Sequence, residues 1–222
     1  MIQAVLFDLD DTLITRTGAI RAFVADQFER FEDKFDGVDA KTYAEQFLRL
    51  EDNGRIPKDR FYPTLVEALG IRAVSADTLL EDYRANYPSY AVLNPGARET
   101  IMAVKTDGLL AGVITNGNER VQKAKLAATG LHDMLDLVVV SEAVGLRKPD
   151  AAIFEYATSG LGVALDSALF VGDNPEVDII GASGAGMQTA WFRNGAMWPT
   201  ALPIRADTDI DHLHEVLHFP GR

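Results

Sequence analysis

Four polar segments, far apart in the chain, carry the side chains that transfer of a phosphoryl group to a carboxylate would need. They are residues 8–12, 115–117, 147–150 and 172–178, and they stand where runs of apolar residues end. Any one of them is a weak signal, because Asp-x-Asp and Asn-Gly sequences are also common in turns and helix caps. The prediction of a functional site therefore rests on the ordered set of four.

Asp8 and Asp10 could divide this chemistry between them. Asp8 is the first side chain after the first apolar run, and Asp10 is close enough to serve the same reaction centre. We expect Asp8 to attack phosphorus and form an aspartyl-phosphate, while Asp10 protonates the leaving oxygen and later deprotonates the hydrolytic water. Lys148 is the third catalytic candidate, because its charge would offset that of Asp8 and of phosphate. Asp11 is expected to be a solvated turn residue.

A divalent cation is expected beside these groups, because several carboxylates facing a phosphate would otherwise repel it. Ligands that are all oxygen atoms favour Mg²⁺. Asp8 and Asp173 are the expected side-chain ligands. Asp178 is expected to hold either a metal-bound water or Lys148 from outside the ligand shell.

The phosphate group is expected to bind at residues 115–117. The Thr115 hydroxyl and the backbone N–H groups of Asn116 and Gly117, near the start of a helix, would form an anion cradle. Lys148 would complete it.

Composition narrows the classes of function. The chain has 222 residues, 47% of them hydrophobic and 24% charged, which is ordinary for a soluble globular protein of one domain, with or without an insertion. The absence of cysteine excludes disulfides, thiolate catalysis and Cys-based zinc sites. A net charge of -12 argues against a nucleic acid polymer as partner. No apolar run approaches the roughly 20 residues that span a bilayer and no secretory signal is visible, so we expect a cytoplasmic protein that acts on a small molecule.

Most of the chain alternates short apolar runs with amphipathic segments. This order predicts an α/β three-layer sandwich, with helices on both faces of a central parallel sheet. In such a sheet all four polar segments lie at the carboxyl ends of strands, where ligands bind. The expected strands are 3–8, 109–115, 136–141, 168–172 and 187–192. The expected helices are 96–107, 118–130, 150–161 and 175–185, with a short last helix near 211–217.

Residues 16–92 follow a different pattern, because their apolar residues recur at helical spacing throughout. They predict a small helical bundle inserted after the first strand, so that the main domain comprises 1–15 and 93–222. A basic cluster of Arg55, Lys58 and Arg60 interrupts the bundle. It is either a solvated loop or a site for a second anionic group of the substrate.

The four segments closely resemble the motifs of the haloacid dehalogenase-like hydrolase superfamily: DxDx[TV], a strand-terminal Thr or Ser, a Lys, and an acidic GDxxxxD-type pattern. All four occur in order between Asp8 and Asp178. The resemblance implies a Rossmann-like core, an Asp nucleophile, a Mg²⁺ requirement and a helical cap of the C1 type that closes over the substrate. It assigns the metal to Asp8, the backbone carbonyl of Asp10, and Asp173. It also implies that Thr12 positions Asp10, and that Asp178 and Asn174 support the site from outside.

Asp10 separates the chemistries of this superfamily. Members that displace halide lack an acid at this position, whereas phosphatases and phosphomutases have one. The resemblance therefore predicts a Mg²⁺-dependent phosphatase acting on a small metabolite such as a nucleotide, a sugar phosphate or phosphoglycolate. A phosphosugar mutase would use the same groups and stays open as an alternative. A non-catalytic binding or regulatory protein is disfavoured, because Asp8, Asp10, Lys148 and Asp173 are all present. The sequence defines neither the substrate nor the oligomeric state.

Overall fold

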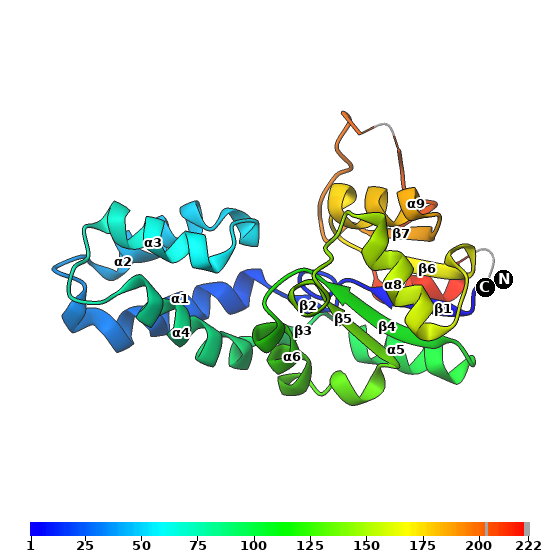
Figure 1. Cartoon of the computed structure of the whole chain (residues 1–222), viewed down its shortest axis with the longest axis horizontal. Helices are drawn as coiled ribbons and strands as arrows, with labels where there is room; N and C mark the ends of the chain where they lie inside the picture. The colour runs from blue at the N-terminus through cyan, green and yellow to red at the C-terminus, as the bar shows by residue number, and fades with distance from the viewer. Residues whose placement is uncertain (203, 220–222) are drawn as a thin grey trace. The chain divides into compact units, whose positions relative to one another are not determined.

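A computed structural model describes residues 1–202 and 204–219 of the chain (Figure 1). The chain divides into two compact units, which we call the core unit and the helical unit. The core unit comprises Met1–Thr15 and Val92–Arg222, and the helical unit comprises Arg16–Ala91.

The core unit is built on a six-stranded parallel sheet with the strand order β5-β4-β1-β6-β7-β8. β1 lies in the middle, and its last residue, Phe7, is in register with Val113 of β4 and Val171 of β6. All four residues of β1 are buried, as expected for a strand covered on both faces. The strands are β1 (Ala4–Phe7), β4 (Leu110–Thr115), β5 (Leu137–Val140), β6 (Ala168–Gly172), β7 (Gln188–Phe192) and β8 (Thr208–Ile210).

Helices cover both faces of this sheet. The chain adds β4 and β5 on one side of β1, then β6, β7 and β8 on the other, so that right-handed connections place their helices on opposite faces. Figure 1 shows α5 and α6 on one side of the sheet and α8 and α9 on the other. The predicted α/β three-layer sandwich is therefore confirmed. The helices are α5 (Ala97–Thr106), α6 (Glu119–Ala128), α7 (Ser141–Val144), α8 (Ala151–Leu161) and α9 (Gly181–Ala185), with short 3-10 turns at His132–Met134 and Leu165–Ser167.

Local sequence signals define both ends of α8. The Asp150 side chain caps α8 by accepting a hydrogen bond from the Ala152 N–H at 3.1 Å. Gly162 ends the same helix in the left-handed conformation, at φ 71°. Between these two signals, Phe154 of α8 packs edge-on against Phe170 of β6, with ring centroids 5.2 Å apart. This contact lies in an apolar cluster of buried residues in the core unit.

Several elements of the core unit differ from the sequence-based expectation. The predicted helix at 175–185 is divided into a π-helical turn (Pro175–Ile180) and α9. The predicted last helix is a 3-10 helix, Leu213–His218, and it follows a sixth strand, β8, that was not expected. A two-stranded antiparallel ribbon of β2 (Ile14–Thr15) and β3 (Val92–Leu93) was also not expected. Strands of two or three residues are too short to show an alternating pattern.

The helical unit contains α1 (Thr17–Phe31), α2 (Ala40–Leu50), α3 (Lys58–Leu69) and α4 (Ala76–Asn86), with 3-10 turns at Glu32–Lys34, Asp52–Gly54 and Tyr87–Tyr90. Its interior is rich in aromatic rings, which meet edge-on around Phe23. The buried Gln27 side chain accepts hydrogen bonds from the Tyr43 and Tyr62 hydroxyls, at 2.8 and 3.0 Å, and donates to the Leu79 carbonyl at 3.0 Å. Within residues 1–202 and 204–219, none of the helices has the length and apolar composition needed to cross a bilayer.

Candidate active site

The predicted site residues follow three adjacent strands at the point where the order of the sheet reverses. Asp8 comes directly after β1, and its backbone N–H donates to the Val171 carbonyl of β6 at 2.8 Å. Thr115 is the last residue of β4, and Asp173 is the first residue after β6. Loops from the two halves of an open α/β sheet separate at such a reversal and leave room for a ligand.

Lys148 lies at the centre of this site. Its Nζ donates to Asp8 Oδ1 at 2.6 Å and to Asp178 Oδ1 at 2.7 Å, and the residue is only 2% exposed. The Asn116 side chain fixes the backbone of Lys148 from both sides, since Asn116 Nδ2 donates to the Lys148 carbonyl at 2.9 Å and Asn116 Oδ1 accepts from the Lys148 N–H at 3.0 Å. Burial opposes the charged form of Lys148, but Asp178 and Asp8 outweigh it and raise the pKa. Lys148 therefore stays positively charged next to Asp8.

The π-helical turn and Gly172 bring Asp178 to this lysine. The Asn174 carbonyl accepts from the N–H groups of both Asp178 (3.0 Å) and Ile179 (3.3 Å), the second of which is a π-type bond. Asp178 Oδ2 in turn accepts from the Asn174 N–H at 3.0 Å. A Cβ at Gly172 would lie 2.5 Å from the Asp178 side chain, so only glycine leaves space for this carboxylate. The position of the Asp178 carboxylate therefore depends on the glycine at position 172.

Asp173 is held in place by Thr12 and Trp191. The Thr12 hydroxyl donates to Asp173 Oδ1 at 3.3 Å and accepts from the Asp173 N–H at 3.1 Å. Trp191 Nε1 donates to the Asp173 carbonyl at 2.8 Å. The side chain of Thr12 therefore supports Asp173, and its predicted role of positioning Asp10 stays a prediction.

Carboxylates crowd together at this site. Oxygen atoms of Asp8, Asp173 and Asp178 all lie within 4.8 Å of one another. Burial raises the pKa of Asp8 to about 7, although Lys148 acts in the opposite direction. Burial and the negative charges of Asp8 and Asp178 raise the pKa of Asp173 to about 9. Three carboxylates with one ammonium group leave excess negative charge on hard oxygen donors, which fits a divalent cation such as Mg²⁺.

Asp10 faces a different set of partners. Its carboxylate accepts from Lys125 Nζ at 2.7 and 2.9 Å, and from Gln122 Nε2 at 2.9 Å. Both partners come from α6, and the sequence analysis missed them. Gln122 and Lys125 occupy buried positions on the helix face that also buries Val121 and Leu126. Polar side chains at apolar positions of an amphipathic helix are the signal that could have revealed them.

Known proteins resemble this chain over nearly its whole length. The family model of the haloacid dehalogenase-like hydrolases matches residues 5–192. This chain belongs to that family. A glyceraldehyde 3-phosphate phosphatase of Pyrococcus furiosus is 31% identical, over 97% of this chain and 93% of the relative. The pyrimidine 5'-nucleotidase YjjG of Escherichia coli is 34% identical, over 85% of this chain and 84% of the relative.

A solved structure adds a three-dimensional match. The HAD-hydrolase YfnB from Bacillus subtilis, solved with bound magnesium, superposes with a TM-score of 0.78 at 25% identity, over 98% of this chain and 97% of that one. The resemblance to haloacid dehalogenase-like hydrolases and the Rossmann-like fold that it implied are therefore confirmed.

In this hydrolase the predicted phosphate-binding segment makes bonds within the protein. The Gly117 N–H donates to Ser141 Oγ at 3.0 Å. Glu142 accepts from the Glu119 N–H at 2.7 Å and from Asn118 Nδ2 at 2.8 Å, and so occupies the start of α6. The Thr115 hydroxyl accepts from Gln122 Nε2 at 2.6 Å. A phosphate would have to displace the Ser141 hydroxyl in order to bind the Gly117 N–H, and the role of that group stays a prediction.

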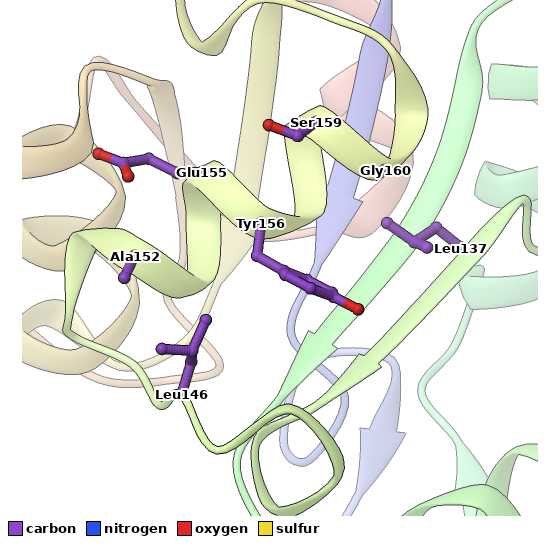
Figure 2. A pocket seen from close by; sticks show the side chains of 7 residues that line it. All are labelled: Leu137, Leu146, Ala152, Glu155, Tyr156, Ser159 and Gly160. Atoms are coloured by element: carbon purple, nitrogen blue, oxygen red, sulfur yellow. The ribbon is translucent and has the colours of Figure 1, made fainter.

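A hollow of about 570 Å³ lies along α8, away from the catalytic candidates of the hydrolase (Figure 2). The side chains of Tyr156 and Leu137, labelled in Figure 2, line part of it. None of the predicted site residues lines this hollow, so it is not the candidate active site. Its lining consists of Leu137, Leu146, Ala152, Glu155, Tyr156, Ser159 and Gly160.

Proposed function

We propose that this chain is a Mg²⁺-dependent phosphatase that hydrolyses a phosphate monoester of a small metabolite through an aspartyl-phosphate. The observation that carries the proposal is the 2.6 Å contact between Lys148 Nζ and Asp8 Oδ1, buried within a cluster of carboxylates. A carboxylate held by a buried cation is oriented for attack on phosphorus. The phosphatase and the nucleotidase among the relatives support the same class of reaction.

In the first step one oxygen of Asp8 would form a bond to phosphorus while the ester P–O bond breaks. The leaving oxygen would take the proton of the Asp10 carboxyl group and depart as an alcohol. Lys148 would offset the negative charge on the transferring group, and the Thr115 hydroxyl would donate to one of its oxygens.

In the second step a water molecule attacks the phosphorus of the aspartyl-phosphate. Asp10, now ionised, would take a proton from this water, and cleavage of the acyl-phosphate would return the Asp8 carboxylate and release inorganic phosphate. Asp10 thereby regains the proton that it gave in the first step, so the cycle closes without another proton donor.

The donor set suits a resident Mg²⁺ ion. Asp8, Asp173 and the backbone carbonyl of Asp10 are the groups proposed to hold it. When bound, the ion supplies positive charge that neutralises the phosphate. The magnesium bound to the relative from Bacillus subtilis supports this choice.

A screen of phosphorylated metabolites with Mg²⁺ and with EDTA tests the proposal. We expect release of phosphate from at least one monoester, and we expect EDTA or Asp8→Asn to lower the rate by at least about 10³-fold. Asp133→Asn is the matched control, because the Asp133 side chain is 98% exposed and lies outside the site. Activity that survives Asp8→Asn would contradict the nucleophile. Transfer to a second sugar hydroxyl in place of water would instead indicate the mutase.

A further inference from the structure

We propose that Gln122 and Lys125 are positioning residues that hold the Asp10 carboxylate in place for proton transfer to the leaving group. This inference rests on the proposed function and goes beyond it, because none of the four motifs contains either residue. It assigns part of the catalytic geometry to α6, a helix outside the nucleophile loop.

The contacts determine the orientation of the Asp10 carboxylate. Lys125 Nζ lies 2.7 Å from Oδ1 and 2.9 Å from Oδ2, so the ammonium group bridges both oxygens. Gln122 Nε2 adds a bond of 2.9 Å to Oδ2. Both α6 residues are almost fully buried, at 3% and 2% exposure, whereas the Asp10 side chain keeps 26%. Two buried donors therefore hold a carboxylate that is still open on one side.

Gln122 also connects Asp10 to the predicted phosphate-binding segment. The same Nε2 that donates to Asp10 donates to Thr115 Oγ1 at 2.6 Å. One amide group thus sets the separation between the general acid and the hydroxyl expected to bind phosphate. The helix starts directly after that segment, since Asn118 caps α6 by accepting from the Val121 N–H at 3.2 Å. A displacement of α6 would therefore disturb both of these contacts.

A purely structural role would not require these residue types. Gln122 and Lys125 lie on the buried face of α6 between apolar residues, where a leucine or methionine would pack without a desolvation cost. Burying a lysine is unfavourable unless its charge is paired, and a hydrophobic replacement of a buried ion pair is often neutral or stabilising. The partner of this lysine is the side chain that the proposed reaction uses for proton transfer.

Proton donation to the leaving group matters most when that group is a poor one. An alkyl phosphate such as glycerol phosphate must be protonated as its ester bond breaks, whereas p-nitrophenolate leaves with little help. The parameter kcat/KM covers the steps up to departure of the leaving group, so the two substrates report separately on this proton transfer. A general loss of folding or binding would lower both values by a similar factor.

The test compares kcat/KM for glycerol phosphate and p-nitrophenyl phosphate, with saturating Mg²⁺, in wild type, Lys125→Met, Lys125→Arg and Gln122→Met. We expect Lys125→Met to lower the value for glycerol phosphate by about 10- to 100-fold, within the range of general acid catalysis, and that for p-nitrophenyl phosphate by less than about 3-fold. Lys125→Arg should recover part of the difference, since arginine can also bridge both oxygens. Gln122→Met should show the same selective loss, and it tests the inference if Lys125→Met does not fold.

Lys123→Met is the matched control. Lys123 lies on the same helix, its side chain is 54% exposed, and it pairs with Glu119 at 2.5 Å, so both substrates should react as in wild type. Equal losses for the two substrates, or no loss in the folded variants, would overturn the positioning role while leaving the phosphatase in place. A wild-type protein that hydrolyses neither these esters nor any phosphorylated metabolite would overturn both proposals.

Discussion

Each of the two units buries a cluster of charged side chains, and the clusters differ in which charge is in the majority. In the core unit the ammonium group of Lys148 contacts Asp8 and Asp178, and Asp173 adds a third carboxylate nearby. In the helical unit the carboxylate of Glu51 accepts from both Arg16 and Lys58, the latter at 3.0 Å.

The pKa values of the carboxylates move in opposite directions in the two clusters. Burial raises the pKa of Asp8 and Asp173, because their neighbours include further carboxylates. Burial also disfavours ionised Glu51, but Arg16 and Lys58 outweigh it and lower the pKa of Glu51. The helical unit therefore stabilises its own ionised carboxylate, whereas the core unit does so incompletely. Buried carboxylates with raised pKa values, as in the core unit, are typical of a site that binds a ligand.

The largest expected difference is in activity. Lys148→Met should lower phosphatase activity by at least about 10³-fold, because the charge that faces Asp8 and the phosphate is lost. Lys58→Met makes the same change in the other cluster, and kcat for p-nitrophenyl phosphate should stay within about 3-fold of wild type. Steady-state rates of the two purified variants check this. A similar loss in both would show that the two clusters do not differ in function.

The next difference is in stability. Glu51→Gln should lower the free energy of unfolding at pH 7 by about 2–3 kcal/mol, since two cations lose their common carboxylate. This value is at or below the usual range for buried pairs, because the Arg16 and Lys58 side chains keep 11% and 13% exposure.

The pH dependence of unfolding checks the cause. A carboxyl group with a lowered pKa stabilises the folded state above its unfolded pKa, near the ordinary value of 4.5, and this contribution is lost as pH falls through the folded pKa. Urea unfolding of the wild type should therefore approach that of Glu51→Gln as the pH is lowered below about 4.5. A difference of constant size at pH 7 and at acidic pH would contradict the ion pair as its source.

The smallest expected effect has the opposite sign. Asp173→Asn should raise the free energy of unfolding at pH 7 by about 1 kcal/mol in EDTA. A carboxyl group with a raised pKa destabilises the folded state above its unfolded pKa, and the amide removes this cost while it keeps an oxygen that can accept from Thr12. Thermal unfolding with and without Mg²⁺ measures it. Mg²⁺ at ten times its Kd should stabilise the wild type by about 1.4 kcal/mol and the variant by less. If Asp173→Asn instead destabilised the protein in EDTA, Asp173 would be a stabilising structural group, as Glu51 is.

Much of the fold could be predicted from the sequence because buried strands and amphipathic helices have clear periodicities. β1, β4 and β6 were predicted to within one residue at each end. β8 was missed, because its three residues join the sheet through pairing with β7, which no local pattern records. The π-helical turn after Asn174 was read as part of one helix, since its spacing differs from an α-helix by a single residue.

The sequence by itself determined which residue types stand after the strands, and with them the family and the kind of chemistry to expect. Only the tertiary structure decided how they are paired. It placed Lys148 between Asp8 and Asp178, and it brought Lys125 and Gln122 of α6 to the Asp10 carboxylate. The reason is physical: periodicity reports that a side chain is buried, whereas its partner depends on how strands and helices distant in the chain pack against one another.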